Sequence, residues 1–134
     1  MRILHSFATI CLFGAALAAA LPACSSDPAP ADDPVGRGAK VWSDQICGSC
    51  HGEDAKGKEG PNITMSKTAG IGNWTYQQFH DAVRLAKDTD GTNLCVFMAS
   101  FTEGEISEAQ MKDLYAYVQS KPISDVVNKG TYCP

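Results

Sequence analysis

Two long segments without apolar periodicity, residues 52–73 and 88–105, constrain the fold of this chain more than any other feature. Both are rich in Gly, Asp, Asn and Lys, and neither shows the alternation of apolar and polar residues expected of a half-buried strand. Loops longer than about 15 residues are uncommon in a small domain unless something packs against them. The chain therefore needs a packing partner besides its own side chains, such as a prosthetic group.

The first of three segments with helical apolar periodicity is predicted to form a helix over residues 34–46. Asp33 is placed as its N-cap and Pro34 at the first helical position, where a missing N–H costs nothing. The apolar side of this helix is expected to comprise Val35, Gly38, Val41 or Trp42, and Ile46. Glycine costs about 1 kcal/mol against alanine in a helix, so the expected use of Gly38 is the close approach of another helix.

Capping signals mark two further helices, predicted at residues 75–87 and 107–120. Each begins with Thr or Ser followed three residues later by Gln, which is the spacing of a capping box. The expected buried stripes are Phe79, Ala82, Val83 and Ala86 in the first, and Met111, Leu114, Tyr115 and Val118 in the second. The sequence thus predicts an all-α domain of three main helices with long loops.

The N-terminus is predicted to be an export signal. Arg2 precedes an apolar run over residues 7–21, which is shorter than the roughly 20 residues that a membrane-spanning helix needs. The run ends in Leu21-Pro22-Ala23-Cys24, which resembles the bacterial lipoprotein signal, in which the cysteine is acylated and becomes the first mature residue. Cleavage of an ordinary export signal is the alternative.

These features divide the chain into three parts: a lipoprotein signal peptide over residues 1–23, a flexible tether over 24–33, and a folded domain over 34–134. The tether carries acids and prolines but no large apolar side chain, which favours an extended, solvated conformation. We expect a protein that faces the bacterial periplasm and is anchored by lipid to the inner or outer membrane.

The chemistry of the chain is predicted to reside in Cys47-Gly48-Ser49-Cys50-His51. Two thiols at this spacing can add to the two vinyl groups of a haem while the next residue ligates its iron, and CxxCH is typical of c-type haem attachment. A redox-active CxxC and half of a zinc site are the alternatives. No βαβ pattern surrounds the motif as in a thioredoxin, and no second CxxC or HxxxH completes a zinc site. One occurrence predicts one covalent haem c.

With this motif the chain resembles the class I mono-haem cytochromes c, from about Gly36 to Val118. The matching positions are Gly38 and Trp42 before the motif, Gly60-Pro61-Asn62 after it, Met98-Ala99-Ser100-Phe101 before the last helix, and Leu114, Tyr115 and Tyr117 within that helix. Ala99 departs from the proline usual after the methionine, which implies a more mobile ligand loop. The stretch from Trp74 to Val118 is especially similar to small cytochromes that accompany periplasmic dehydrogenases.

The resemblance implies a methionine as the second axial ligand of the iron. Of the four methionines, Met1 leaves with the signal and Met111 lies on a buried helical stripe, which leaves Met98 and Met65. Met98 precedes the last helix and matches the ligand position of the family, whereas Met65, water or another side chain are the alternatives. His80 is expected on a helix surface rather than at the iron.

Other residues receive roles from the same resemblance. The carbonyl of Pro61 is expected to accept the Nδ1–H of His51, the alternative being a simple turn proline. Trp74 is expected either to donate its indole N–H to a haem propionate or only to pack at the start of the second helix. The distal side of the haem is expected to be lined by Leu94, Phe97 and Phe101.

Two cysteines, Cys95 and Cys133, are left once Cys11 departs with the signal and the other three receive their roles. Exported thiols usually pair, so we predict a disulfide between them, with two free thiols as the alternative. The bond would tie the C-terminal tail to the methionine loop.

The predicted function is outer-sphere electron transfer by one haem c with His51 and Met98 as axial ligands, without catalysis of a substrate reaction. Expected partners are a dehydrogenase, a quinol-oxidising complex or a terminal oxidase or reductase, besides the membrane. Nucleic acid is excluded, because 11 Lys and Arg against 15 Asp and Glu give a formal charge of −4. A fixed subunit of a larger complex, or a ligand-binding haem sensor with a labile methionine, are the alternatives.

Overall fold

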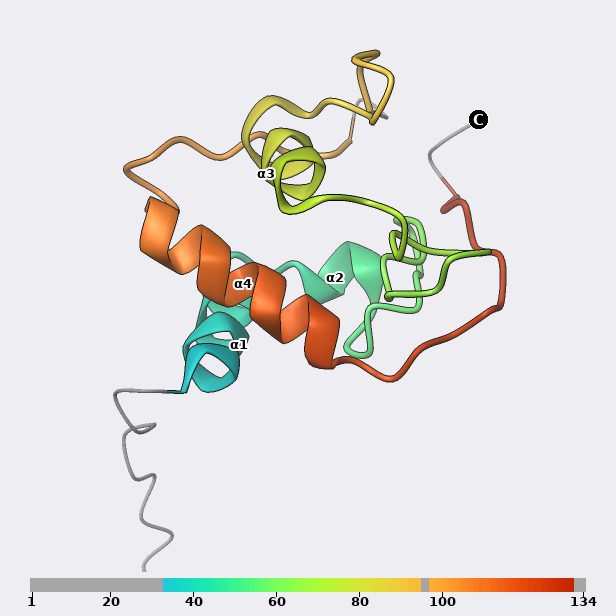
Figure 1. Cartoon of the computed structure of the whole chain (residues 1–134), viewed down its shortest axis with the longest axis horizontal. Coiled ribbons are helices and arrows are strands. Elements are labelled where there is room, and N and C mark those ends of the chain that lie inside the picture. Colours follow the sequence, from blue (N-terminus) through green and yellow to red (C-terminus); the bar gives the residue numbers. More distant parts are fainter. Residues whose placement is uncertain (1–32, 95–96, 132–134) are drawn as a thin grey trace, which may run out of the picture.

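The computed structural model describes residues 33–94 and 97–131, and within these ranges it contains four α-helices and no β-sheet. The helices are α1 (Pro34–Asp44), α2 (Gly48–His51), α3 (Tyr76–Leu85) and α4 (Glu108–Ser120). Helices α1 and α4 pack together, and α3 contacts α4 on another side (Figure 1). The predicted all-α class is therefore confirmed. No helix of the described part is both long and apolar enough to cross a membrane.

Several predicted features lie outside the described residues. They are the signal peptide, the lipid anchor Cys24, nearly all of the tether, and both cysteines of the predicted disulfide, Cys95 and Cys133. These features stay predictions.

The predicted helix starts are confirmed by their caps. The side chain of Asp33 accepts the N–H of Gly36 at 2.9 Å, and Pro34 occupies the first turn of α1. Helices α3 and α4 each begin with a complete capping box, led by Thr75 and Ser107, in which side chain and backbone satisfy each other reciprocally. Local sequence alone therefore fixes where these three helices begin.

The predicted ends of the first two helices were wrong by two residues each. Helix α1 ends at Asp44 because Ile46 has a positive φ of 50°, so its exposed side chain leaves the apolar side to which it was assigned. Helix α3 ends at Leu85 because Ala86 adopts the left-handed conformation as C-cap. The chain then turns after Ile46 into α2, a helix that was not expected.

The crossing of α1 and α4 depends on Gly38, as predicted. A Cβ at this position would collide with the backbone carbonyl of Asp113 and would lie 2.7 Å from the Cβ of Tyr117. Beside this contact, Arg37 forms a two-pronged ion pair with the largely buried Asp113, with Nε and Nη2 at 2.8 and 2.9 Å from the two carboxylate oxygens. The two helices are thus held at backbone contact distance.

The core lies between these helices and the loops. Its buried apolar members are Val41, Trp42, Ala55, Ile71, Phe79, Val83, Ile106, Met111, Leu114 and Val118. The predicted stripes of α3 and α4 supply half of them, and the loops supply Ala55, Ile71 and Ile106. The loops therefore carry part of the core, although their sequence shows no helical or strand period.

The C-terminal strap, residues 122–131, binds the loop that follows α2. The buried side chain of Asn62 donates to the carbonyls of Ser124 and Val126 at 2.8 and 2.9 Å, and its backbone N–H donates to the carbonyl of Asn128 at 2.8 Å. Figure 1 shows this red segment returning beside the green loops. The strap fixes the loop from a distance of more than sixty residues in the chain.

Replacing Gly38 by Ala should destabilise the domain. Alanine is the better helix former by about 1 kcal/mol, but overpacking against a backbone carbonyl costs more, so we expect a net loss of about 2 kcal/mol. Chemical denaturation of the haem-loaded protein measures this loss. The matched control is Gly104→Ala, because the nearest atom to a Cβ there lies 3.9 Å away. Equal stability of the two variants would contradict the close crossing.

Candidate haem site

Helix α2 and the turn before it position the CxxCH motif. The N–H of Cys47 donates to the carbonyl of Trp42 at 3.0 Å, which ties the motif to the end of α1. The N–H of His51 in turn bonds the carbonyl of Cys47 at 3.0 Å, so one helical turn places the first thiol and the imidazole at fixed relative positions. Gly52 follows with a φ of 74° and ends the helix. The short helix therefore presents both thiols and the imidazole as one unit.

The imidazole of His51 is oriented by a backbone carbonyl. Its Nδ1 lies 2.9 Å from the carbonyl oxygen of Pro61, which can only accept, so Nδ1 carries the proton. His51 is 9% exposed, and burial lowers the pKa of its imidazole, with the Pro61 bond opposing this shift. A Cβ on Gly60 would lie 3.2 Å from the ring, so glycine allows this close approach. His51 is thus held neutral, with the lone pair on Nε2.

A cavity of about 220 Å³ lies next to this unit. The motif and its approach contribute Gln45, Ile46, Cys47, Ser49, Cys50 and His51; the following loop contributes Glu59, Gly60 and Pro61; the segment before α4 contributes Phe97, Met98, Ala99 and Phe101. Most of the walls are apolar. Chain segments separated by some fifty residues thus enclose one space beside both thiols and the imidazole.

The environment of Cys47 differs from that of a reactive redox thiol. Burial raises the pKa of Cys47 to about 11, the opposite of the lowered pKa of a reactive redox thiol. No group of three or more His, Cys, Asp or Glu side chains among the described residues is arranged to hold a metal ion. Two thiols and one neutral imidazole beside an apolar cavity fit the vinyl groups and iron of a haem.

The cytochrome c family profile matches residues 35–122, which is more than half of the chain. The chain belongs to the cytochrome c family. Membership carries covalently bound haem c and the function of a haem electron carrier, as the motif predicted.

Two curated relatives are dehydrogenase cytochrome subunits. This cytochrome is 33% identical over 125 residues to the fructose dehydrogenase cytochrome subunit of Gluconobacter japonicus, covering 80% of this chain and 26% of the relative. It is 41% identical over 56 residues to the gluconate 2-dehydrogenase cytochrome c subunit of Pantoea cypripedii, covering 42% of this chain and 13% of the relative. The cytochrome therefore spans about a quarter or less of the relatives it matches.

A solved structure, the dihydro-heme d1 dehydrogenase NirN in complex with DHE, aligns with a TM-score of 0.48 and 23% identity. The alignment covers 64% of this chain and 16% of that one.

The methionines of the cytochrome occupy different environments. Met98 is half-buried and lines the cavity beside the motif, whereas Met111 is fully buried in the core between helices. Met65 is half-buried against the core and is not among the described lining residues. The geometry thus brings one of the two candidate ligands to the cavity and leaves the other away from it.

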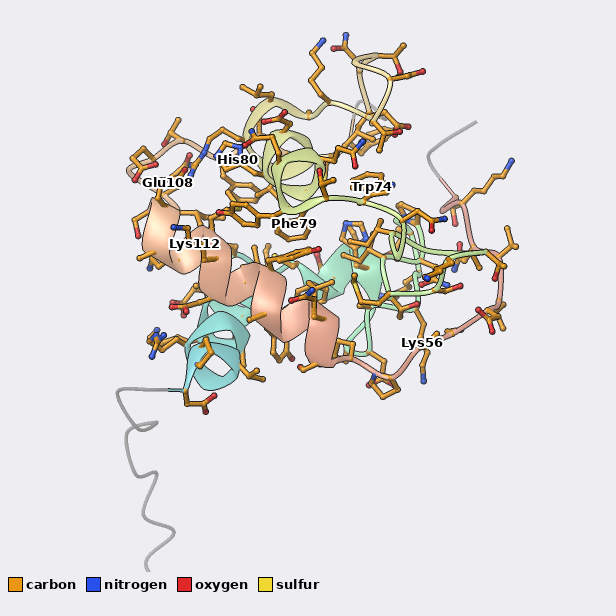
Figure 2. All side chains as sticks on the ribbon, in the orientation of Figure 1. Lys56, Trp74, Phe79, His80, Glu108 and Lys112 are labelled. Carbon is orange, nitrogen blue, oxygen red and sulfur yellow. The ribbon has the colours of Figure 1, made fainter. Side chains whose placement is uncertain are left out.

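His80 is engaged elsewhere. Its Nδ1 lies 3.0 Å from Asp81 and its Nε2 lies 2.9 Å from Glu108, so both ring nitrogens face carboxylates. Figure 2 shows His80 and Glu108 close together at the start of α4. The bond to Asp81, aided by Glu108, raises the pKa of His80. This histidine therefore links α3 to α4 and is not among the described residues of the cavity wall.

Two residues given haem roles by the resemblance do not line the described cavity. Trp74 is half-buried, lies on the segment leading into α3 and packs against the core (Figure 2). Leu94 is half-buried, and its N–H bonds the carbonyl of Ala86 at 2.7 Å. By contrast Ile46, assigned by its sequence to the helix core, lines the cavity. An apolar residue directly before CxxCH was the signal available for this placement.

The contact of His80 should make stability depend on pH. A histidine with a raised folded pKa contributes stability that is complete below the unfolded pKa of 6.5 and is lost as the pH rises through the folded value. We expect the free energy of unfolding to fall above pH 6.5 more steeply in the wild type than in His80→Gln. Denaturation series at several pH values measure this. The control Lys112→Gln, on the partner helix α4, should keep the wild-type slope. A wild-type slope in His80→Gln would contradict the assignment.

Proposed function

We propose that His51 and Met98 are the two axial ligands of the haem iron and that the cytochrome passes single electrons through the haem edge beside Cys47 and Cys50. One observation carries this proposal: the cavity that adjoins the motif is also lined by Met98. No rearrangement of the described backbone is needed to bring the two candidate ligands to one space.

Haem c, when bound, supplies a one-electron Fe(II)/Fe(III) couple, and His/Met ligation raises its potential. Residues around the cavity fix the position of the candidate ligands. Pro61 fixes the tautomer of His51 and its ring orientation, which leaves Nε2 free to ligate. Phe101 is half-buried and adds an apolar side chain to the cavity wall that Met98 also lines. Ligands that stay in place in both redox states keep the reorganisation small.

The rim of the cavity supports contact with a redox partner. Ile46 and Phe97 are 71% and 66% exposed although both line the cavity, and Cys50 is exposed beside them. Exposed large apolar side chains around a site are typical of a contact surface. A small interface of this kind forms and separates quickly, as electron transfer requires.

The partner that the comparisons favour is a dehydrogenase. The two relatives carry the names of fructose and gluconate dehydrogenase subunits, although the chain covers only 26% and 13% of their lengths. We assign the cytochrome the same kind of donor, a dehydrogenase of sugar-like substrates, and the role of a non-catalytic electron carrier. A quinol-oxidising complex is the other candidate electron donor. Terminal oxidases or reductases are the candidate electron acceptors.

The relatives also support a second role for the same haem chemistry, that of a fixed subunit. Both are named as subunits of their dehydrogenases, which supports a fixed subunit as well as a free carrier. The residues Leu21-Pro22-Ala23-Cys24 support a lipid anchor that would keep the cytochrome on a bacterial membrane, facing the periplasm. An anchored carrier needs only lateral diffusion to meet a membrane-bound dehydrogenase.

Replacing Met98 by Ala should remove the sulfur–iron band from the ferric visible spectrum and lower the potential of the haem. Thioether sulfur favours the reduced metal, so its loss favours the oxidised form. Absorption spectra of both redox states and a potentiometric titration measure the change. The matched control is Met65→Ala, which should keep both the band and the potential. An unchanged Met98→Ala spectrum would refute this ligand, and loss of the band in Met65→Ala would reassign it.

The two forms of partnership can be separated by purification. The tagged, lipidated cytochrome is extracted in mild detergent from its native membrane, and the eluate is assayed for dehydrogenase activity with sugars and sugar acids. A fixed subunit elutes with a dehydrogenase at constant ratio through gel filtration. A free carrier elutes alone and is reduced by added dehydrogenase fractions in a stopped-flow assay. Failure of every sugar-oxidising fraction to reduce it would contradict the proposed donor.

A further inference from the structure

We propose that Arg84 is a positioning residue that holds the Met98 segment, residues 97–106, against α3. The inference rests on the proposed function, because the purpose of this hold is to keep Met98 at the iron. The guanidinium donates from Nη1 to the carbonyl of Phe101 at 2.9 Å and from Nη2 to the carbonyl of Ile106 at 2.8 Å. One side chain of α3 thus spans two backbone carbonyls of the segment that carries the candidate ligand.

The contact pins the backbone close to Met98. Phe101, three residues further along, also donates its N–H to the carbonyl of Val83 at 3.0 Å. Both backbone polar groups of Phe101 are therefore bound by consecutive residues of α3, one through the helix backbone and one through Arg84. Loss of either bond would therefore give the backbone between Met98 and Phe101 more freedom to move.

Charge fixes the guanidinium in this place. Its side chain is only 13% exposed, and Nη2 also lies 3.2 Å from Glu103 and 3.1 Å from Glu108. Glu103 in turn accepts the N–H of Glu108 at the start of α4 at 3.0 Å. A largely buried cation that is shared by two carboxylates and two carbonyls has little freedom to leave. The hold therefore extends from α3 through the segment to the first turn of α4.

The geometry requires arginine. The two carbonyls belong to residues five apart, Phe101 and Ile106, and they are reached by different nitrogens of one planar fork. A lysine presents a single nitrogen and can satisfy one of these carbonyls at a time. The residues after Met98 do not supply the restraint themselves, since Ala99 and Ser100 are exposed and neither fixes a backbone torsion as proline does.

The test compares Arg84→Gln and Arg84→Lys with the wild type as haem-loaded proteins. The first readout is the rate at which added imidazole displaces the sulfur ligand from the ferric haem. The second is hydrogen exchange at the amide of Phe101. Loss of bonds to a charged donor should speed both by about tenfold in Arg84→Gln, with Arg84→Lys in between.

The matched control is Arg37→Gln, which removes an equivalent arginine–carboxylate pair between α1 and α4. It should lower global stability while leaving both readouts near the wild-type values. Equal imidazole rates and equal Phe101 exchange in Arg84→Gln and Arg37→Gln would overturn the proposal. If Arg84→Gln does not fold, wild-type values in Arg84→Lys would overturn it as well. If Met98→Ala shows that Met98 is not a ligand, hydrogen exchange at Phe101 still tests whether Arg84 holds this segment. Failure of the proposed function and failure of this proposal can therefore be told apart.

Discussion

The close crossing of α1 and α4 at Gly38 determines where the rest of the molecule can lie. With the backbone of Asp113 against Gly38, Trp42 one turn later is buried, and its carbonyl receives the N–H of Cys47. The motif therefore begins at a point fixed by helix packing. From Cys47 one helical turn carries the chain to His51, so the imidazole takes its position from the crossing rather than from its own surroundings alone.

The two sides of the cavity are secured by the same kind of contact, in which the backbone carbonyl of a loop is bound by the side chain of a helix. On one side Pro61 binds His51, and the neighbouring Asn62 is fastened to the C-terminal strap. On the other side the carbonyl of Phe101 is bound by Arg84. Loops with no regular structure become rigid in this way, because their polar groups are satisfied by partners that belong to helices or to the strap.

Features that depend on neighbouring residues could be predicted from the sequence, whereas features that depend on contacts between distant residues could not. Capping boxes at Thr75 and Ser107 marked two helix starts, since a cap needs only four consecutive residues. Ile46 was misplaced because helical periodicity continues through it, while the turn into α2 gives it a positive φ and moves it to the cavity. No sequence motif marks the contacts of the strap or of Arg84. Every residue has a backbone carbonyl, so the sequence does not show which carbonyls a single Asn or Arg side chain binds.

These anchors bear on whether the cytochrome serves as a carrier or as a sensor of added ligands. A sensor needs one ligand that departs easily, and Met98 lies on the segment with exposed Ala99 and Ser100, which offers that freedom. Against this, Phe101 is bound through both its N–H and its carbonyl. Phe101 lies three residues beyond Met98, so the backbone is anchored to α3 close to the proposed ligand. Such an anchor fits the proposed electron carrier, whose ligand stays in place, better than a sensor, whose ligand has to depart.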